Sequence, residues 1–468
     1  MYQYKDLEDT IAAIATPAGQ GGIGIIRISG KDAIAIADGV LRLGKDKSLA
    51  ACKSHTVHHG WAISPKRPQD EALLDEVLVS LMKAPHSYTA EDVVEINCHG
   101  GITVLRAVLQ AVLSSGARLA TPGEFTKRAF LNGRLDLAQA EAVIDIIHAK
   151  TETFLRQSHH QLKGELSTRL NEIREELIKL YTMVEALINF PEDGIDAQGR
   201  RQISGRIKAQ EDLVGKLLIS SRSGRILKEG IRIVICGKPN VGKSSLLNAL
   251  LKEQRAIVTE IAGTTRDVLE ESAQIEGIPI SLVDTAGILE PRDLIEEEAV
   301  KRSHLYIKGA DLVLLVLDNN RPLEEQDKLL IEQLKSTRVL VVVNKMDLGK
   351  RLDTTLPGKI FGQDQVVRVS ALESHSIQEL EAKIVGSIRH DKDLETHGIL
   401  LSNIRHIKAL EEGQQNLQSA CRLMDENTSL EFISEELKSA VNQLDAITGR
   451  NIDEDLLDRI FSEFCIGK

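Results

Sequence analysis

The chain has 468 residues, of which 42% are hydrophobic and 27% are charged, and its formal net charge is −11. This composition is typical of a globular protein and excludes a disordered chain or a fibre, and the acidic balance excludes the overall basic field of a non-specific nucleic-acid binder. At about 150 residues per domain, the length predicts roughly three domains. Because the chain as a whole is acidic, any contact with RNA would depend on a local basic patch.

The sequence gives no sign of a membrane or secreted protein. No apolar run reaches the roughly 18 residues that would span a bilayer, and the stretch from Met1 to Asp9 carries acids where a signal peptide would be basic and then apolar. The five cysteines are scattered and include no Cys-x-x-Cys pair, which favours neither a disulfide framework nor a structural zinc site. We expect a cytoplasmic protein with reduced thiols and no membrane contact.

Residues 1–120 mix short β-type runs with a helical stretch. The β-type runs are 24–30, 76–82 and 92–97, and a helix is expected over 104–113. The pattern predicts a small α+β domain.

Two later segments have helical periodicity, and we assign them to the two parts of one helical domain, 121–228 and 392–468. The second part has too little apolar surface to fold alone, so we expect it to pack against the first. Residues 190–194 break the first part. The apolar residues expected on one face of the second part are Leu430, Ile433, Leu437, Ala440, Val441 and Leu444.

Residues 229–391 have a different pattern, with nearly all-apolar runs at 231–236, 280–283, 312–317 and 339–343, separated by helical lengths. Such runs are typical of buried parallel strands in an α/β domain. We expect this domain to be inserted into the helical one, which is tolerated because domain termini often lie close together.

A complete phosphate-binding motif, G-K-P-N-V-G-K-S, runs from Gly237 to Ser244, between the strand 231–236 and a helix expected over 245–250. Backbone amides of such a loop surround phosphates, Lys243 would reach the terminal phosphates, and the Ser244 hydroxyl would bind Mg²⁺. A chance glycine-rich turn is disfavoured because strand, loop and helix occur in the right order. The predicted phosphate-binding residues are Asn240, Val241, Gly242, Lys243, Ser244 and Ser245.

Two further segments fit the phosphate end of this site. Asp284-Thr285-Ala286-Gly287 follows the strand 280–283, where an acid can hold Mg²⁺ through water and a glycine amide can meet the γ-phosphate. Residues 263–267, Gly-Thr-Thr-Arg-Asp, form a polar stretch that fits either a mobile switch or an ordinary turn. As a switch, it would supply Thr265 as a second hydroxyl ligand of Mg²⁺.

The base is predicted from Asn344-Lys345-Met-Asp347, which follows the strand 339–343. The Asp347 carboxylate can accept hydrogen bonds from both N1–H and N2–H₂ of guanine, whereas adenine would leave it unpaired. This pattern predicts GTP as the nucleotide. The loop expected to close over the guanine contains Ser370, Ala371 and Leu372.

Hydrolysis by this site is expected to be slow without help. Ile288 follows the Asp284 motif where a Ras-like switch has a Gln that orients water, and the amide oxygen of Asn240 is placed to ligate a cation. Something must therefore supply positive charge and a group that positions water.

The phosphate loop together with residues 263–267 resembles the TrmE–Era–Der class of GTPases. Motifs outside that domain narrow the resemblance to the MnmE (TrmE) family of tRNA-modification GTPases, and the resemblance covers the whole chain. These motifs lie at 22–30, 87–92, 98–101, 122–137 and 464–468.

The resemblance implies a multidomain α/β protein. Residues 1–120 would form an α+β domain that dimerises and binds tetrahydrofolate, followed by a helical domain into which a Ras-like P-loop GTPase domain is inserted. With a flavin-dependent partner, MnmG, the family adds an aminomethyl or carboxymethylaminomethyl group to C5 of the wobble uridine of tRNA. The one-carbon unit comes from a tetrahydrofolate, in its 5,10-methylene or 5-formyl form, and GTP hydrolysis is required.

The resemblance also assigns residues that spacing alone does not. From spacing alone, Arg27 and Glu91 would be surface or structural charges, and Cys465 would belong to a frayed end. By resemblance, K⁺ is held by Asn240, Thr259, Ile261 and Thr264, with Thr259 and Thr264 also near the nucleotide. The folate site would use Arg27, Glu91, Arg134 and Lys468. The expected catalytic residues are Lys243, Thr265, Glu296, which helps position water, and Cys465.

Three functions remain open from the sequence. The leading hypothesis is a K⁺-stimulated GTPase in tRNA wobble-uridine modification. A ribosome-assembly GTPase would bring an RNA-binding module such as a KH domain with its G-x-x-G loop, and the sequence indicates none. A folate-binding protein whose GTPase is only a switch would bind folate without requiring Cys465.

Overall fold

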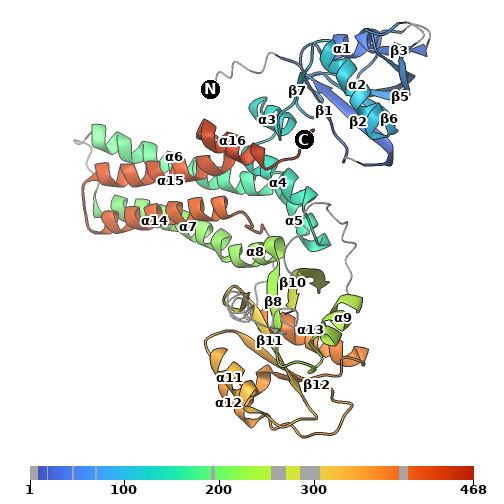
Figure 1. Cartoon of the computed structure of the whole chain (residues 1–468). Coiled ribbons are helices and arrows are strands. Elements are labelled where there is room, and N and C mark those ends of the chain that lie inside the picture. The colour runs from blue at the N-terminus through green and yellow to red at the C-terminus, as the bar shows by residue number, and fades with distance from the viewer. Residues whose placement is uncertain are drawn as a thin grey trace, which may run out of the picture. The chain divides into compact units, whose positions relative to one another are not determined.

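The structure is a computed structural model that describes residues 9–17, 19–44, 47–68, 71–190, 196–253, 270–284, 306–388 and 399–468 (Figure 1). The chain divides into two compact units. One unit contains Met1–Ile144, Gln161–Ile178 and Lys438–Lys468, and the other contains Asp145–His160 and Lys179–Leu437.

The first unit is built on a seven-stranded sheet with the order β3-β4-β5-β6-β2-β1-β7. Its strands pair antiparallel except for β1 with β7. The runs expected at 24–30, 76–82 and 92–97 are confirmed in β2, β5 and β6. The strands are β1 Ile11–Ile14, β2 Gly21–Ser29, β3 Leu41–Leu43, β4 Thr56–Ile63, β5 Leu73–Met82, β6 Val93–Gly100 and β7 Arg118–Leu119.

Helices α1 (Ala33–Gly39) and α2 (Ile102–Ser114) pack on this sheet, with a short 3-10 helix, η3, at Leu49–Ala51. The helix expected over 104–113 is therefore confirmed. The core between helices and sheet is aliphatic and contains fully buried Ile28 and Val108. The expected α+β character follows from burying one face of the sheet under helices.

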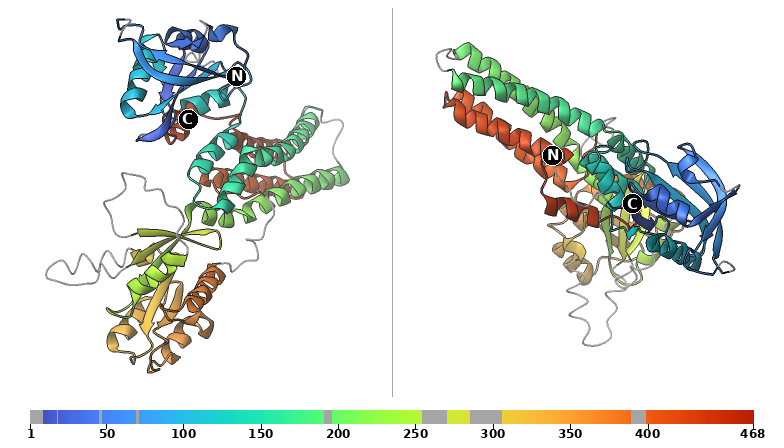
Figure 2. Two further views of the ribbon diagram at one scale, coloured as in Figure 1. Left: turned by 90° about the vertical axis from the view of Figure 1, so that its right-hand side faces the viewer. Right: turned by 90° about the horizontal axis from the view of Figure 1, so that it is seen from above.

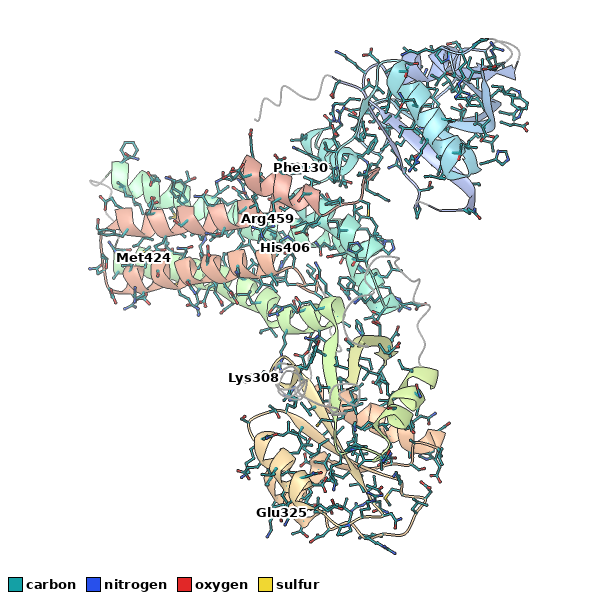
Figure 3. The ribbon with its side chains drawn as sticks, viewed as in Figure 1. Phe130, Lys308, Glu325, His406, Met424 and Arg459 are labelled. Carbon is teal, nitrogen blue, oxygen red and sulfur yellow. The ribbon has the colours of Figure 1, made fainter. Side chains whose placement is uncertain are left out.

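The same unit contains α3 (Glu124–Leu131) and the C-terminal helix α16 (Glu454–Ser462), which share an apolar cluster. The ring of Phe130 on α3 lies 6.4 Å from that of Phe461 on α16, and Phe130 is labelled in Figure 3. This packing places the end of the chain beside α3, because the Gly123 amide donates to the Cys465 carbonyl.

Long helices on both sides of the α/β segment lie side by side, most clearly α7 with α14 (Figures 1 and 2). Gln418 on α14 donates to Glu211 on α7 at 2.9 Å. Among the described helices, none is long and apolar enough to cross a bilayer. The helices of this group are α4 Leu137–Ile147, α5 Glu152–Leu162, α6 Glu165–Asn189, α7 Ala197–Ile219, α8 Ser221–Glu229, α14 Ile404–Asp425 and α15 Leu430–Thr448.

Helix α15 has the face that its periodicity predicts. Ile433, Leu437, Ala440 and Leu444 are buried, and the other two expected positions are partly buried. Helix α6 ends at Asn189, immediately before the predicted break. The domain boundaries at residues 120, 228 and 391 stay predictions.

The second unit contains a six-stranded sheet with the order β13-β12-β11-β8-β10-β9. All pairs are parallel except β9 with β10. The four predicted strands are confirmed as β8, β10, β11 and β12. The strands are β8 Ile231–Cys236, β9 Glu270–Ile275, β10 Ile278–Asp284, β11 Leu312–Asp318, β12 Val339–Asn344 and β13 Val366–Arg368.

Every residue of β11 and β12 is buried, as expected for central parallel strands covered on both faces. The carboxyl ends of these strands meet at one edge of the sheet, where ligands of open α/β sheets bind. The helices of this segment are α9 Lys243–Glu253, α11 Glu325–Gln333, α12 Thr355–Phe361 and α13 Ser374–Ile388, with a 3-10 turn, η6, at Gln363–Gln365.

Candidate functional site

The phosphate loop lies between the end of β8 at Cys236 and the start of α9 at Lys243. Its backbone has positive φ at Asn240 (66°) and at Gly242 (95°). A Cβ on Gly242 would lie 2.3 Å from the side-chain nitrogen of Asn344, so only glycine allows the two loops to approach this closely.

The side chain of Lys243 is enclosed by the phosphate loop. Its side chain is buried, and Nζ donates to the carbonyls of Gly237 and Lys238, both at 2.9 Å. The positive charge is therefore held inside the loop, while Ser244 and Ser245 are exposed in the first turn of α9. This arrangement suits terminal phosphates at a helix N-terminus.

The backbone of β10 ends at the same edge, because Asp284 pairs with Ile235 of β8. The predicted acid is thus the last residue of a strand that pairs with β8, which leads into the phosphate loop. Several predicted site residues lie outside the described part of the chain, so their roles stay predictions: Thr259, Ile261, Thr264, Thr265, Thr285, Ala286, Gly287 and Glu296.

The segment predicted to recognise guanine, residues 344–347 (the guanine loop), is joined to the phosphate loop through Asn344. Its side-chain nitrogen donates to the Val241 carbonyl at 3.0 Å, and its oxygen accepts from the Ala371 amide at 3.2 Å. The Ser370 hydroxyl donates to the Asp347 carboxylate at 2.8 Å. The structure therefore brings the three predicted segments, the phosphate loop, residues 344–347 and residues 370–372, together at one edge.

Leu372 and Lys345 complete this part of the site. Leu372 is 84% exposed and free to cover a base. The ammonium of Lys345 donates to the Asn240 carbonyl at 2.7 Å and to the Asp318 carboxylate at 2.7 Å. Asp318, the last residue of β11, was not predicted, although an acid at the end of a buried parallel strand is a usable signal.

Another unpredicted contact anchors the phosphate loop. Lys238 donates to Glu324 and pairs with Asp327, both at 2.8 Å. These acids form the capping box of α11, whose first residue, Glu325, is labelled in Figure 3. Lys238 thus connects the phosphate loop to α11, a helix that lies outside the phosphate-binding motif.

A separate cationic cluster lies in the first unit around Tyr88. The guanidinium of Arg27 lies 5.5 Å from the Tyr88 ring centre and 5.6 Å from that of Phe125, and Arg134 lies 5.0 Å from Tyr88. Arg27 also bonds Glu95 at 2.8 Å. Two arginines predicted from motifs far apart in sequence therefore share one aromatic ring, within cation–π distance.

The C-terminal tail reaches this cluster. Arg27 donates to the Gly467 carbonyl at 3.1 Å, and a Cβ on Gly467 would lie 2.4 Å from the Ile14 carbonyl oxygen. Burial and the neighbouring Arg27 lower the pKa of Lys468. The structure thus brings Arg27, Arg134 and Lys468 together, with the exposed Cys465 three residues before the last.

Glu91 belongs to a different set of contacts. Its carboxylate accepts from Ser29 at 2.7 Å and from Arg128 at 3.1 Å. Arg128, which was not predicted, is fully buried and also contacts Asp9 and Glu124. Arg128 lies within the family motif at residues 122–137, but the residues around it do not distinguish it from a surface arginine.

Comparison with known proteins decides the family. The family described as GTP-binding protein TrmE N-terminus matches residues 10–134, and the family described as MnmE helical domain matches residues 137–465. The tRNA modification GTPase MnmE of Alkaliphilus oremlandii is 43% identical over 462 residues, which are 99% of this chain and 100% of that protein. The chain belongs to the MnmE family of tRNA modification GTPases.

Two further relatives have the same name. The tRNA modification GTPase MnmE of Thermoanaerobacter pseudethanolicus is 45% identical over 461 residues, 98% of this chain and 99% of that protein. That of Enterococcus faecalis is 42% identical over 461 residues, 98% of both chains. Among solved structures, the G domain of the T. maritima FeoB iron transporter is 33% identical over 34% of this chain and 98% of that one, with a TM-score of 0.26.

Proposed function

We propose that this MnmE-family chain is a K⁺-stimulated GTPase that acts with a flavin-dependent partner, MnmG, on tRNA. Together they would add an aminomethyl or carboxymethylaminomethyl group to C5 of the wobble uridine. The observation that carries the proposal is the match along almost the whole chain to relatives named tRNA modification GTPase. The convergence of the phosphate and guanine loops supports it.

GTP would bind through both loops. Asp347 would pair with the guanine, and Lys243 would neutralise the terminal phosphates. The exposed Ser244 hydroxyl fits Mg²⁺, which prefers oxygen ligands, and Thr265 and Asp284 would complete its surroundings. Mg²⁺ would supply neutralisation of the charge that develops on the phosphates.

K⁺ would bind next to the phosphates. Asn240 is exposed, and its left-handed backbone is held by the Lys345 bond to its carbonyl. An amide oxygen suits a monovalent cation, and the other proposed ligands are Thr259, Ile261 and Thr264. K⁺ would supply the transition-state charge that other GTPases obtain from arginine. Glu296 would position the attacking water.

A tetrahydrofolate, in its 5,10-methylene or 5-formyl form, would bind in the first unit and supply the one-carbon unit. The cations of Arg27, Arg134 and Lys468 beside the rings of Tyr88 and Phe125 fit a ligand that is both aromatic and anionic. Glu91 would contribute from the adjoining ion network, and Cys465 would be the thiol used in modification. We also propose a homodimer formed through residues 1–120 and a cytoplasmic location.

GTP hydrolysis measured in KCl and in NaCl at equal ionic strength tests the GTPase part. The rate should be higher in K⁺, and Asn240→Ala should abolish the difference. Asn427→Ala is a matched control, because Asn427 is another exposed asparagine with positive φ, at 58°. Equal rates in both salts for the unmodified protein would refute K⁺ stimulation.

A further inference from the structure

The ammonium of Lys345 occupies a junction between two loops. One hydrogen bond reaches the phosphate loop at the Asn240 carbonyl, and the other reaches the Asp318 carboxylate, both at 2.7 Å. The Lys345 side chain is 30% exposed, but that of Asp318 is only 6% exposed. The acid is therefore the fixed member of this pair.

Asp318 is fixed by the strand that it ends. It pairs in register with Asn344 of β12, and its second carboxylate oxygen accepts from the Asn320 amide at 2.9 Å. Burial raises the pKa of Asp318, but the hydrogen bonds from Lys345 and Asn320 outweigh it and hold the pKa below its ordinary value. The carboxylate is thus charged at neutral pH, and each of its two oxygens accepts a hydrogen bond that orients it toward Lys345.

The bond from Lys345 to Asn240 restrains a left-handed backbone. Asn240 has φ of 66°, a conformation that few non-glycine residues adopt and that asparagine tolerates better than most. Lys345 itself has φ of 65° and lies in the loop that recognises the base. One ammonium therefore connects the left-handed residue of the phosphate loop with the guanine loop.

We propose that Asp318 is a positioning residue for nucleotide binding: through Lys345, it holds the phosphate loop at Asn240 against the guanine loop. This inference rests on the nucleotide site proposed above. Asp318 does not need to touch the nucleotide. Loss of the Asp318 carboxylate leaves the Lys345 ammonium without its charged partner. This ammonium then no longer holds the phosphate loop against the guanine loop before GDP binds.

A double-mutant cycle on the full chain tests this role, with the affinity for a fluorescent GDP derivative as the measurement. Asp318→Asn should weaken binding about tenfold, which is the usual scale for one charge-assisted hydrogen bond. In a Lys345→Met background, the same Asp318→Asn change should have almost no further effect. An equal loss in both backgrounds, or no loss with Lys345 present, would overturn the proposal.

Two controls keep the result interpretable. Arg321→Ala should leave GDP affinity unchanged, because Arg321 is 61% exposed and 4.0 Å from the same carboxylate. If Asp318→Asn does not fold, Asp318→Glu serves in the cycle, with a smaller loss of GDP affinity that must again disappear in the Lys345→Met background.

A separate measurement tests the nucleotide site itself. GDP binding that is unaffected by Asp347→Ala would refute the proposed nucleotide site, and this inference with it.

Discussion

Asp347 is the residue on which we propose that selection of the base depends. Its carboxylate is oriented by Ser370 and matches the two donors of guanine. Asp347→Asn should weaken GTP binding about 100-fold or more and favour xanthine nucleotides, whose additional carbonyl accepts from an amide. Competition binding with GTP and XTP measures the change.

Ser370→Ala is the control for this prediction. It removes the hydrogen bond to the carboxylate but leaves the carboxylate itself, so it should weaken GTP binding modestly and preserve the preference for guanine. Undiminished selectivity for GTP in Asp347→Asn would remove Asp347 from the base site.

Tyr88 is predicted to organise the cationic cluster, since both Arg27 and Arg134 lie over its ring. Tyr88→Leu should weaken binding of a tetrahydrofolate about tenfold, because cation–π contacts of this kind contribute up to about 1 kcal/mol each. Tyr88→Phe keeps the ring and loses only the hydroxyl contact to Thr126, so its affinity should be close to normal. Calorimetry gives both values, and an equal effect of the two changes would contradict the role of the ring.

At the scale of elements, apolar strands were predictable and polar or short ones were not. Strands β8, β11 and β12 are covered on both faces, so their sequences are nearly continuous runs of apolar residues. Strand β9 reads Glu-Glu-Ser-Ala-Gln-Ile and pairs only at the sheet edge. Strand β7 has two residues, and its pairing with β1 depends on neighbours far away in sequence.

The same distinction applies to the site. Asn344, Asp347 and Lys243 lie in local motifs whose spacing reflects a strand followed by a loop. Tyr88 and Arg128 acquire their contacts from partners far along the chain, and no local pattern distinguishes them. Asp318 had a usable signal, because it is an acid at the end of a buried parallel strand. The Arg27 bond to Gly467 joins residues 440 positions apart, and only the resemblance had placed Arg27 in one site with the neighbouring Lys468.

The ion pairs of Glu124, on α3, with Arg118 and Arg128 should make the free energy of unfolding depend on pH. Burial raises the pKa of Glu124, but hydrogen bonds from Arg118 and the Thr121 amide and the charges of Arg118 and Arg128 lower it overall. A lowered folded-state pKa stabilises the fold above the unfolded value, 4.5, and this contribution is lost as the pH falls through the folded-state pKa.

Glu124→Gln should therefore reduce the free energy of unfolding by about 3 kcal/mol at pH 7, the usual scale for breaking a buried pair. The difference from the unmodified protein should shrink as the pH falls below 4.5. Denaturant titrations from pH 7 to pH 3 measure it. Glu152→Gln, which alters an exposed pair with Arg156, should change little at any pH, and a pH-independent effect of Glu124→Gln would contradict the account.

At the scale of the whole molecule, the thiol proposed for modification and the proposed GTPase site belong to different units. Cys465 lies in the first unit and the phosphate loop in the second. Cys465→Ser should therefore leave K⁺-stimulated GTP hydrolysis intact while abolishing wobble modification in a reaction reconstituted with the flavin-dependent partner. Full modification by the serine variant would reduce Cys465 to a packing residue, and loss of both activities would indicate a structural tail.

Mass analysis of wobble nucleosides from cells that lack this chain is the decisive test of a role in tRNA modification. We expect the aminomethyl-type group at C5 of the wobble uridine to disappear in these cells. The unmodified gene should restore it, whereas Lys243→Ala should not, because we propose that the modification requires GTP hydrolysis. Unchanged wobble nucleosides in the deleted cells would contradict a role in tRNA modification, whatever GTPase activity the purified protein shows.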